Sequence, residues 1–451
     1  MTLTTFYSYH NKGDAIILDS TIKFLRTVFR SISLTLVTID YESFRGTERV
    51  WGPECVIYPL PLPTPLRNIL SNLLGRGNSE LMKGPYSLLY RFTNAAYMRW
   101  LTGLLGILLT LGLITAAVTF RRVDTNLNTI MERFDDADLV VAIGGGYLFS
   151  NLGAFLYLFP IIYAKVIAKR KVVFLCHSIG SLLDPFTRSF VRIVLERADA
   201  IVLREKTSYQ YVKNSLKLRN KNLVLANDMA FLFARRSRQR STKSHDVVGM
   251  NIRNWFFNDP RQFDNYFRSM VETAERLITH GYRVCLVPFG YILGREDDMT
   301  PSRLLKECIR PALRNQVEIL NIRDMSAASI LDLFGNLGFR FFIGTRVHSN
   351  VASWLSGVPT IAISYLHFIT HGLAKDMQIE RYVVDVESIN STTLMEKVMQ
   401  LDRDHDRISR LLQERCISIG SAMLQKLGPL LEKMTRVDAS RTCTVRQNVV
   451  R

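Results

Sequence analysis

Short runs of apolar, mostly β-branched residues recur along the first half of the chain. Each run leads into glycine or polar residues and then into a longer stretch with helical periodicity. Runs of this kind are typical of parallel strands that are buried on both faces of a sheet. Their alternation with helices predicts a doubly wound α/β domain. The predicted strands are 2–8, 34–39, 139–143, 171–175, 200–203 and 222–225.

This pattern stops once and then begins again. Almost no apolar residue occurs in 234–246, after which we predict strands at 247–252, 283–287, 318–320, 339–343 and 360–364, and helices at 265–278, 302–312, 327–334 and 404–434. The sequence thus predicts an N-terminal Rossmann-like domain (1–233), a basic linker (234–246), a C-terminal Rossmann-like domain (247–435) and a polar tail (436–451). Because parallel sheets bind ligands at the carboxyl ends of their strands, we expect the site in a cleft between the two domains. This is an α/β, GT-B-like arrangement in outline, which the pattern alone does not separate from other folds with two Rossmann-like domains.

One segment of the first domain does not fit this alternation. Residues 100–120 contain no charged side chain, and Arg99, Arg121 and Arg122 flank them. Their length matches the hydrocarbon core of a bilayer. A crossing would, however, put two parts of one predicted domain on opposite sides of the membrane. We therefore expect an apolar helical insertion that attaches to an anionic membrane surface without crossing it; a buried or oligomer-interface helix and a transmembrane segment are the alternatives.

Composition narrows the class of partner. The 451 residues include 58 Lys+Arg against 40 Asp+Glu, a net charge of +18, and 47% of them are hydrophobic, which excludes a disordered chain. The positive charge suits nucleic acid, an anionic membrane or acidic substrates, but no nucleic-acid-binding motif accompanies it, so we expect no nucleic acid. Six cysteines without a CxxC pair, and an N-terminus without a signal-peptide pattern, predict a cytoplasmic protein at the membrane face.

Two glycine-containing turns follow predicted strands of the first domain. The first is Asn11-Lys12-Gly13-Asp14, where free backbone N–H groups at a helix start can bind an anion or sugar hydroxyls. A turn in which Asp14 merely caps the helix is the alternative. The second is Gly144-Gly145-Gly146, where the backbone can approach a ligand closely. It is not a GxGxxG motif, so we expect no nicotinamide cofactor.

Three further strand ends of the first domain carry polar side chains. At Cys176-His177, neighbouring residues of a strand point to opposite faces, which argues against a nucleophilic Cys176. Arg204 and Asp228 follow the next two strands. Because parallel strands end at the same edge of a sheet, these side chains are candidates to face the cleft.

The most informative turn is Gly344-Thr345-Arg346-Val347-His348-Ser349, in the second domain. Arg346 offers a planar fork for a carboxylate or phosphate at a helix N-terminus, where the helix dipole also favours an anion. His348 titrates near neutrality and can serve as acid or base. Arg253, after strand 247–252, is a second anion-binding candidate. A helix-capping turn with an exposed histidine is the alternative.

Taken in order, these motifs resemble those of polysaccharide pyruvyl transferases. The segments that carry the resemblance are NKGDAIIL (11–18), DLVVAIGGGYL (138–148), HSIGS (177–181), LREKTS (203–208), NDMAFL (227–232) and GTRVHSNVASWLSGVPTIAISY (344–365). The resemblance implies a GT-B-like fold and transfer of a pyruvyl group from phosphoenolpyruvate to a sugar, usually as a ketal. It implies no cofactor other than this donor and no metal.

The resemblance also implies roles for individual residues. It places the anionic groups of the donor on Arg346, Arg253, Arg204 and Ser349. It makes His348 the acid that protonates the methylene carbon, and it makes Asp14 the group that orients or deprotonates the acceptor. The acceptor sugar is expected against Asn11, Gly13, Gly145, Gly146, His177 and Asp228, the last two being the alternatives to Asp14 as base.

Two other functions remain open from the sequence. A GT-B glycosyltransferase would use a nucleotide-sugar and needs an acidic residue for the donor ribose, for which Asp376, Glu380 and Asp385 are weak candidates. A non-catalytic, membrane-associated glycan-binding protein could keep the same fold. The expected partners are phosphoenolpyruvate, a sugar or glycan acceptor, either free or lipid-linked, and a membrane surface.

Overall fold

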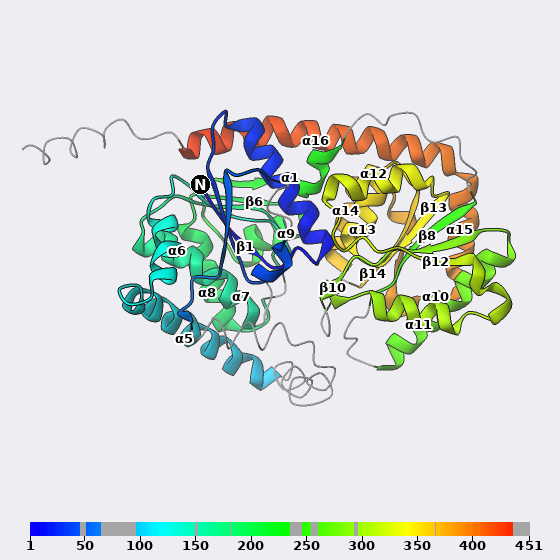
Figure 1. The fold of residues 1–451 in the computed structure, drawn as a ribbon, viewed down its shortest axis with the longest axis horizontal. Coiled ribbons are helices and arrows are strands. Elements are labelled where there is room, and N and C mark those ends of the chain that lie inside the picture. The colour runs from blue at the N-terminus through cyan, green and yellow to red at the C-terminus, as the bar shows by residue number, and fades with distance from the viewer. Residues whose placement is uncertain are drawn as a thin grey trace, which may run out of the picture.

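The computed structural model describes residues 1–45, 51–64, 96–148, 152–180, 182–234, 246–253, 260–292, 296–365 and 367–435. The tail 436–451 and all but the two end residues of the predicted linker lie outside these ranges. Two parallel sheets lie side by side, with helices around each of them (Figure 1).

The first sheet has seven strands in the order β3-β2-β1-β4-β5-β6-β7, and every neighbouring pair is parallel. Successive residues of its strands alternate between two apolar clusters, with Val141 in one and Val140 in the other, so both faces are buried. This explains the continuous apolar runs. The strands are β1 (Thr2–Phe6), β2 (Leu34–Thr38), β3 (Cys55–Pro59), β4 (Val140–Ala142), β5 (Val172–His177), β6 (Ala200–Leu203) and β7 (Leu223–Leu225).

The second sheet has six parallel strands in the order β12-β9-β8-β13-β14-β15. They are β8 (Val247–Asn251), β9 (Arg283–Leu286), β12 (Val317–Ile319), β13 (Phe341–Gly344), β14 (Thr360–Ser364) and β15 (Val383–Asp385). A short antiparallel hairpin, β10 (Tyr291–Ile292) with β11 (Glu296–Asp297), follows β9. Four strands were not predicted from the sequence: β3 and β15, which form sheet edges, and the two strands of the hairpin, which have two residues each.

Both sheets have the Rossmann strand order, as predicted. In each sheet the order in which successive strands are added reverses once, although all the strands are parallel. The reversal lies between β1 and β4 in the first sheet and between β8 and β13 in the second. At such a point the connections leave to opposite sides, which opens a crevice beyond the carboxyl ends of the two strands. The turns singled out from the sequence, at 11–14, 144–147, 253 and 344–349, follow these four strands.

Helix α1 (Lys12–Val28) lies between the two sheets and is buried along almost its whole length (Figure 1). It begins at Asn11, whose side chain accepts hydrogen bonds from the N–H groups of Gly13 and Asp14. It packs on α12, α13 and α16, which belong to the C-terminal part of the chain. The remaining longer helices are α5 (Ala96–Phe120), α6 (Thr125–Asp135), α7 (Leu152–Ile162), α8 (Pro185–Arg197), α9 (Lys206–Gln210), α10 (Pro260–Thr279), α11 (Met299–Cys308), α12 (Ala327–Leu337), α13 (Val347–Leu355), α14 (His367–Asp376), α15 (Ser391–Arg403) and α16 (His405–Thr435).

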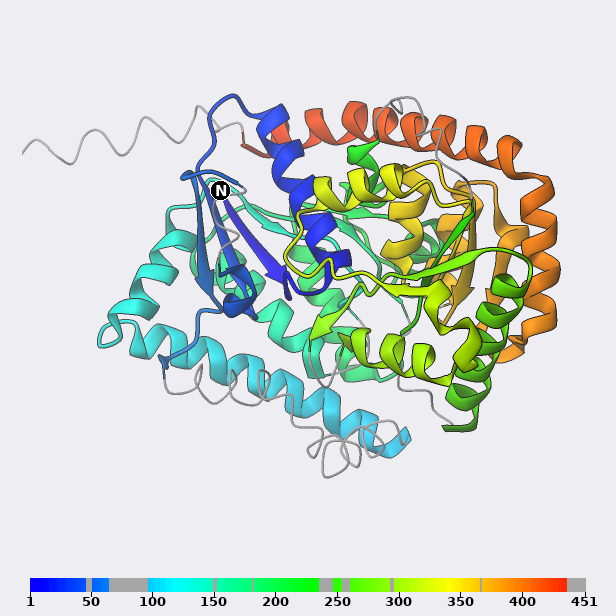
Figure 2. The same ribbon diagram turned by 45° about the vertical axis from the view of Figure 1, so that its right-hand side comes forward.

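Helix α16 runs along one rim of the molecule and spans both sheets (Figures 1 and 2). It packs on α13 and α15 of the second sheet and on the 3₁₀ turn Met229–Phe233 of the first. The ammonium group of Lys426 donates to the carbonyl of Leu225 at 2.7 Å. One apolar cluster therefore continues from the first sheet into the second.

Substitution by alanine should change the stability in opposite directions at two helical glycines, Gly420 on α16 and Gly335 on α12. A Cβ at Gly420 would lie 2.7 Å from the carbonyl oxygen of Phe231, whereas one at Gly335, on α12, meets nothing within 4 Å. We expect Gly420→Ala to lower the free energy of unfolding by about 1–2 kcal/mol through overpacking. Gly335→Ala should raise it by about 0.5–1 kcal/mol through helix propensity. Urea denaturation measures both, and a stabilising Gly420→Ala would contradict the packing.

Candidate functional site

Backbone contacts bring the two crevices together. The N–H of Lys12 donates to the carbonyl of Phe289 at 2.8 Å, and the N–H of Tyr291 donates to the carbonyl of His10 at 3.0 Å. Asn11 also forms an isolated antiparallel bridge with Gly290. The turn after β1 is thus held against the segment after β9, so that strand ends of both sheets surround one region.

A buried bidentate ion pair anchors the turn after β13. Arg346 donates from Nε and Nη2 to the two oxygens of Asp298, at 2.7 and 2.9 Å. Asp298 also accepts the N–H groups of Phe289 and Gly290, each at 3.0 Å. Burial opposes the charge on Arg346, but Asp298 and Glu296 outweigh it and raise the pKa of the guanidinium. A side chain at Gly290 would clash with this guanidinium, so the glycine is required there.

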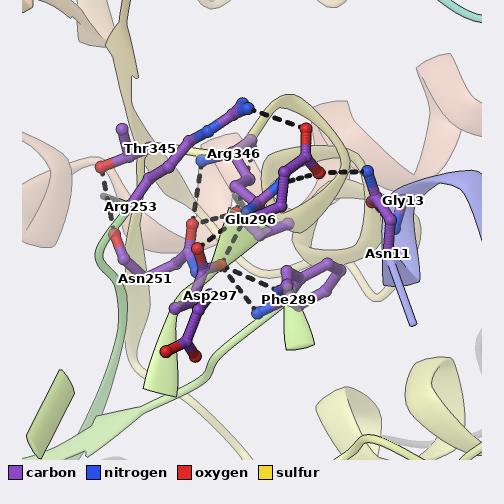
Figure 3. A network of polar contacts seen from close by, with 12 residues as sticks. Asn11, Gly13, Asn251, Arg253, Phe289, Glu296, Asp297, Thr345 and Arg346 are labelled. Carbon is purple, nitrogen blue, oxygen red and sulfur yellow. Dashed lines mark hydrogen bonds and ion pairs between the residues drawn. The ribbon is translucent and has the colours of Figure 1, made fainter. Parts of the chain in front are cut away.

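Glu296 joins this pair to the first sheet (Figure 3). Its carboxylate accepts from Arg346 Nη1 at 3.0 Å, from Arg253 Nη2 at 3.2 Å and from Asn11 Nδ2 at 2.7 Å. Arg253 also donates to the hydroxyl of Tyr365 and lies 4.7 Å from the centre of its ring. The side chain of Glu296 is 23% exposed, the largest fraction among these ion-paired groups. Two arginines therefore already hold a carboxylate at the mouth of the crevice.

A second ion-paired group crosses between the sheets. Asp228, which follows β7, accepts from Arg204 Nη1 at 2.6 Å and contacts Nε2 of His348, on α13, at 3.3 Å. Burial acts to raise the pKa of Asp228, but His348 and Arg204 together hold it well below its usual range. The carboxylate is therefore ionised at neutral pH, and Nε2 of His348 carries a proton toward it. Arg204 is buried and also donates to Ser178 Oγ at 2.6 Å.

The start of α1 packs directly on the histidine ring. A Cβ at Gly13 would lie 2.5 Å from Nδ1 of His348, so any side chain there would displace the ring. Asp228 contacts Nε2, and the other ring nitrogen, Nδ1, lies against the start of α1. This explains the glycine of the first motif by a contact with the last motif.

Asp14 and Tyr147 lie at the two strand ends of the first crevice. Burial raises the pKa of Asp14 to about 7, the charge of Glu296 adds to the rise, and Tyr147 and Arg346 partly oppose it. Within the part of the chain that the structure describes, neither Asp14 Oδ2 nor the Tyr147 hydroxyl makes a hydrogen bond of good geometry. Buried polar atoms without partners are rare, so both are groups that a bound ligand can satisfy.

The other candidate residues have local packing roles. A side chain at Gly144 would meet the carbonyl oxygens of Leu175 and Cys176 at 2.6 Å, and one at Gly145 would clash with the Tyr147 ring. These glycines thus make room for protein atoms, and Gly146 lies half-buried in the same turn. Ser349 donates to the carbonyl of Arg346 at 2.7 Å within the first turn of α13.

His177 and Cys176 are both buried at the end of β5. His177 donates from Nε2 to the carbonyl of Ala142 at 3.2 Å, and burial lowers its pKa to about 3, so the ring is neutral at pH 7. Cys176 has a φ of 56°, a left-handed conformation that is uncommon outside glycine. Burial raises the pKa of its thiol well above the usual value, which makes a reactive thiolate unfavourable.

The structure thus brings together most of the predicted residues and adds four that the sequence analysis missed. Those that meet around the crevice are Asn11, Gly13, Asp14, Asp228, Arg253, Arg346 and His348, with Arg204 buried behind Asp228. The additions are Glu296, Asp298, Tyr147 and Tyr365. Glu296 and Asp298 lie in and after the unpredicted hairpin, and no local pattern marks them as partners of arginines far away in sequence. Among the described residues, no group of three or more His, Cys, Asp or Glu side chains is arranged to hold a metal.

Comparison of the sequence with known proteins assigns the chain to a family. The model of the polysaccharide pyruvyl transferase family matches residues 11–367. The amylovoran biosynthesis protein AmsJ of Erwinia amylovora is 21% identical over 331 residues, which cover 67% of this chain and 76% of AmsJ.

Solved structures share the fold at low sequence identity. HepE of Anabaena, in complex with UDP-glucose, has a TM-score of 0.55 and is 11% identical over 96% of this chain and 100% of its own. A glycosyltransferase from Rickettsia africae has the same TM-score and identity, over 96% and 98% of the two chains. These likenesses confirm the predicted GT-B-like fold.

The buried carboxyl of Asp14 predicts a pH-dependent stability. Its pKa rises from 3.8 to about 7 on folding, so between these values the folded chain keeps a proton that the unfolded chain has released. The free energy of unfolding of the wild type therefore falls as the pH rises through this window. Asp14→Asn lacks this dependence, and at pH 8 it should be more stable than the wild type by up to about 4 kcal/mol, with little difference at pH 4.

Urea denaturation at several pH values measures the effect. Asp264→Asn, at an exposed position of α10, is the control and should follow the wild type throughout. Equal stability of Asp14→Asn and the wild type at pH 8 would show that Asp14 is not held in this raised-pKa environment.

Proposed function

Because the chain belongs to the polysaccharide pyruvyl transferase family, we propose that it transfers the pyruvyl group of phosphoenolpyruvate to a sugar of a polysaccharide or glycan precursor, forming a pyruvate ketal. The observation that supports this most is the crevice itself. Two arginines of one sheet hold a carboxylate there, and a histidine on an ionised aspartate lies beside the start of α1. The likeness to a protein of amylovoran biosynthesis supports a polysaccharide or its precursor, free or lipid-linked, as the acceptor.

The donor would bind where Glu296 now lies. Phosphoenolpyruvate carries a carboxylate and a phosphate, both of which suit the planar forks of Arg253 and Arg346. In the structure the charges of these arginines are balanced by Glu296 and Asp298. Asp298 is fully buried, whereas the side chain of Glu296 is 23% exposed, so an incoming anion would replace Glu296 and leave the Asp298 pair intact.

Arg204 has a different role in this proposal. Its guanidinium is buried against Asp228, Ser178 and Glu205, which leaves it behind the crevice. It helps to hold Asp228 in its ionised form, and Asp228 in turn contacts Nε2 of His348 at 3.3 Å. Arg204 is therefore a positioning residue.

His348 would supply the proton that starts the reaction. Protonation of the methylene carbon of the donor makes the neighbouring C2 electrophilic, and Asp228 offsets the charge of the imidazolium before the transfer. One acceptor hydroxyl then attacks C2, and the bond from C2 to the phosphate oxygen breaks. A second hydroxyl closes the ketal. Of the two hydroxyl protons released, one replaces the proton given to the methyl group and the other leaves with phosphate.

Asp14 would accept a hydroxyl proton. With a pKa of about 7 it exists in both protonation states at neutral pH, and its unpartnered oxygen is available to an acceptor hydroxyl. The Tyr147 hydroxyl, which interacts with Asp14, would orient the same sugar.

Glycosyl transfer from a nucleotide-sugar is the second candidate, because the similar solved structures include a UDP-glucose complex. Asp385 is one of the acidic residues considered for binding a donor ribose, and it accepts a hydrogen bond from His371 at 2.7 Å. Binding of the two donor classes separates the two functions.

We expect phosphoenolpyruvate to raise the melting temperature of the purified protein, and UDP-glucose to leave it unchanged. A ligand at about 100 times its dissociation constant adds roughly 2.7 kcal/mol of stability. Glu296→Gln removes the competing negative charge, so it should respond at several-fold lower phosphoenolpyruvate concentrations than the wild type. Glu307→Gln, at an exposed position of α11, is the matched control. A shift with the nucleotide-sugar alone would favour glycosyl transfer.

Replacing His348 should affect the chemical step. We expect His348→Gln to lower kcat by about 10²–10⁴, the usual contribution of a general acid, while KM for phosphoenolpyruvate changes less than about threefold. Phosphate release in the presence of acceptor measures both constants. His280→Gln, at an exposed position after α10, should leave both unchanged. An increase in KM with an unaltered kcat would make His348 a binding group instead.

A further inference from the structure

Helix α5 is attached to the first sheet's helical layer along a stripe of small and apolar residues. This buried stripe repeats every three or four positions and consists of Gly103, Gly106, Thr110, Leu113 and Ala117. It packs on α7 and α8. A side chain at Gly106 would clash with the Phe155 ring, and one at Gly103 with Asp184 and Phe186, so the helix lies close against its neighbours.

The opposite face of α5 is exposed and equally apolar. Its exposed large side chains range from 41% to 56% accessible and are Leu101, Leu104, Leu105, Leu108, Leu111, Val118 and Phe120. A helix that faces water normally carries charged residues on that side, but none occurs in 100–120. Nor is this a core helix, since only 28% of its most apolar window, Gly103–Phe120, is buried.

The position of α5 in the fold is incompatible with a membrane crossing. The described strand before it, β3, and the first strand after it, β4, belong to the same parallel sheet. The helix also packs lengthwise on α7 and α8 of that domain. In both views it runs along the rim opposite α16 (Figures 1 and 2).

Charge indicates what covers this face. The segment 65–122 contains one acidic residue, Glu80, and seven basic ones: Arg67, Arg76, Lys83, Arg91, Arg99, Arg121 and Arg122. Arg121 is paired with Asp135, whereas Arg122 is exposed. Helix α8, which packs on α5, adds exposed arginines at 188, 192 and 197, of which Arg192 lies 3.9 Å from Glu196. A second copy of this chain would bring like charges together, whereas anionic lipid headgroups complement them.

We propose that α5 lies in the plane of an anionic membrane, with the exposed leucine face inserted at the boundary between headgroups and acyl chains. Arg122 and the exposed arginines of α8 would contact lipid phosphates. The protein would thus be held on the membrane by a helix that does not cross it. This attachment is independent of which group the crevice transfers.

Vesicle flotation tests the proposal with the full-length protein. We expect binding to vesicles of phosphatidylcholine and phosphatidylglycerol to exceed binding to phosphatidylcholine alone, and to weaken as salt is added. Leu105→Glu combined with Leu108→Glu should lower the partition coefficient by at least about tenfold. Leu304→Glu combined with Leu424→Glu is the matched control, because these leucines are each 44% exposed on α11 and α16. It should bind as the wild type does.

Three results would overturn the proposal. The first is unchanged vesicle binding by the Leu105/Leu108 variant with a melting temperature equal to that of the wild type. The second is resistance of the membrane-bound protein to extraction by alkaline carbonate, which would indicate a crossing. The third is a wild-type dimer that does not bind vesicles and dissociates in the variant, which would assign the face to a second copy of the chain.

Discussion

The architecture of the crevice depends on the buried ion pair between Arg346 and Asp298. This pair holds the turn after β13, and through the N–H groups of Phe289 and Gly290 it also holds the segment after β9. That segment binds the backbone at the start of α1, so the two sheets meet in one fixed relation. Two charges taken out of water in this way are tolerated only when both partners are present and well hydrogen-bonded, as they are here.

Burial and neighbouring charge give three acid–base groups of the crevice different states at neutral pH. Asp228 is ionised because His348 and Arg204 compensate for its burial. Burial raises the pKa of Asp14 to about 7 and the charge of Glu296 adds to the rise, while Tyr147, Arg346 and Arg204 only partly oppose it. His177 is buried and neutral. Environments that separate the pKa values of neighbouring groups are typical of sites that move protons, and here they favour His348 on Asp228 as the acid and Asp14 as the base.

Much of this arrangement could be predicted from the sequence, because the strands are buried on both faces and read as apolar runs. The turns that follow them identified Asp14, Arg346 and His348. The sequence could not show that Arg346 is paired with Asp298, since those residues meet only through the tertiary fold. It also could not show that Gly13 is required by the His348 ring, or that Gly144 and Gly145 make room for protein atoms. The length of the apolar helix could be predicted from the sequence, but which of its faces is buried depends on its contacts with α7 and α8.

The most direct measurement of the proposed activity is the fate of the pyruvyl carbon. The protein would be incubated with isotopically labelled phosphoenolpyruvate and the glycan fraction of cells that carry it, and the labelled products analysed by nuclear magnetic resonance. We expect a ketal carbon attached to two sugar oxygens and an equal amount of released phosphate, both absent with His348→Gln. Release of phosphate with free pyruvate as the only labelled product, or consumption of a nucleotide-sugar in place of phosphoenolpyruvate, would contradict it.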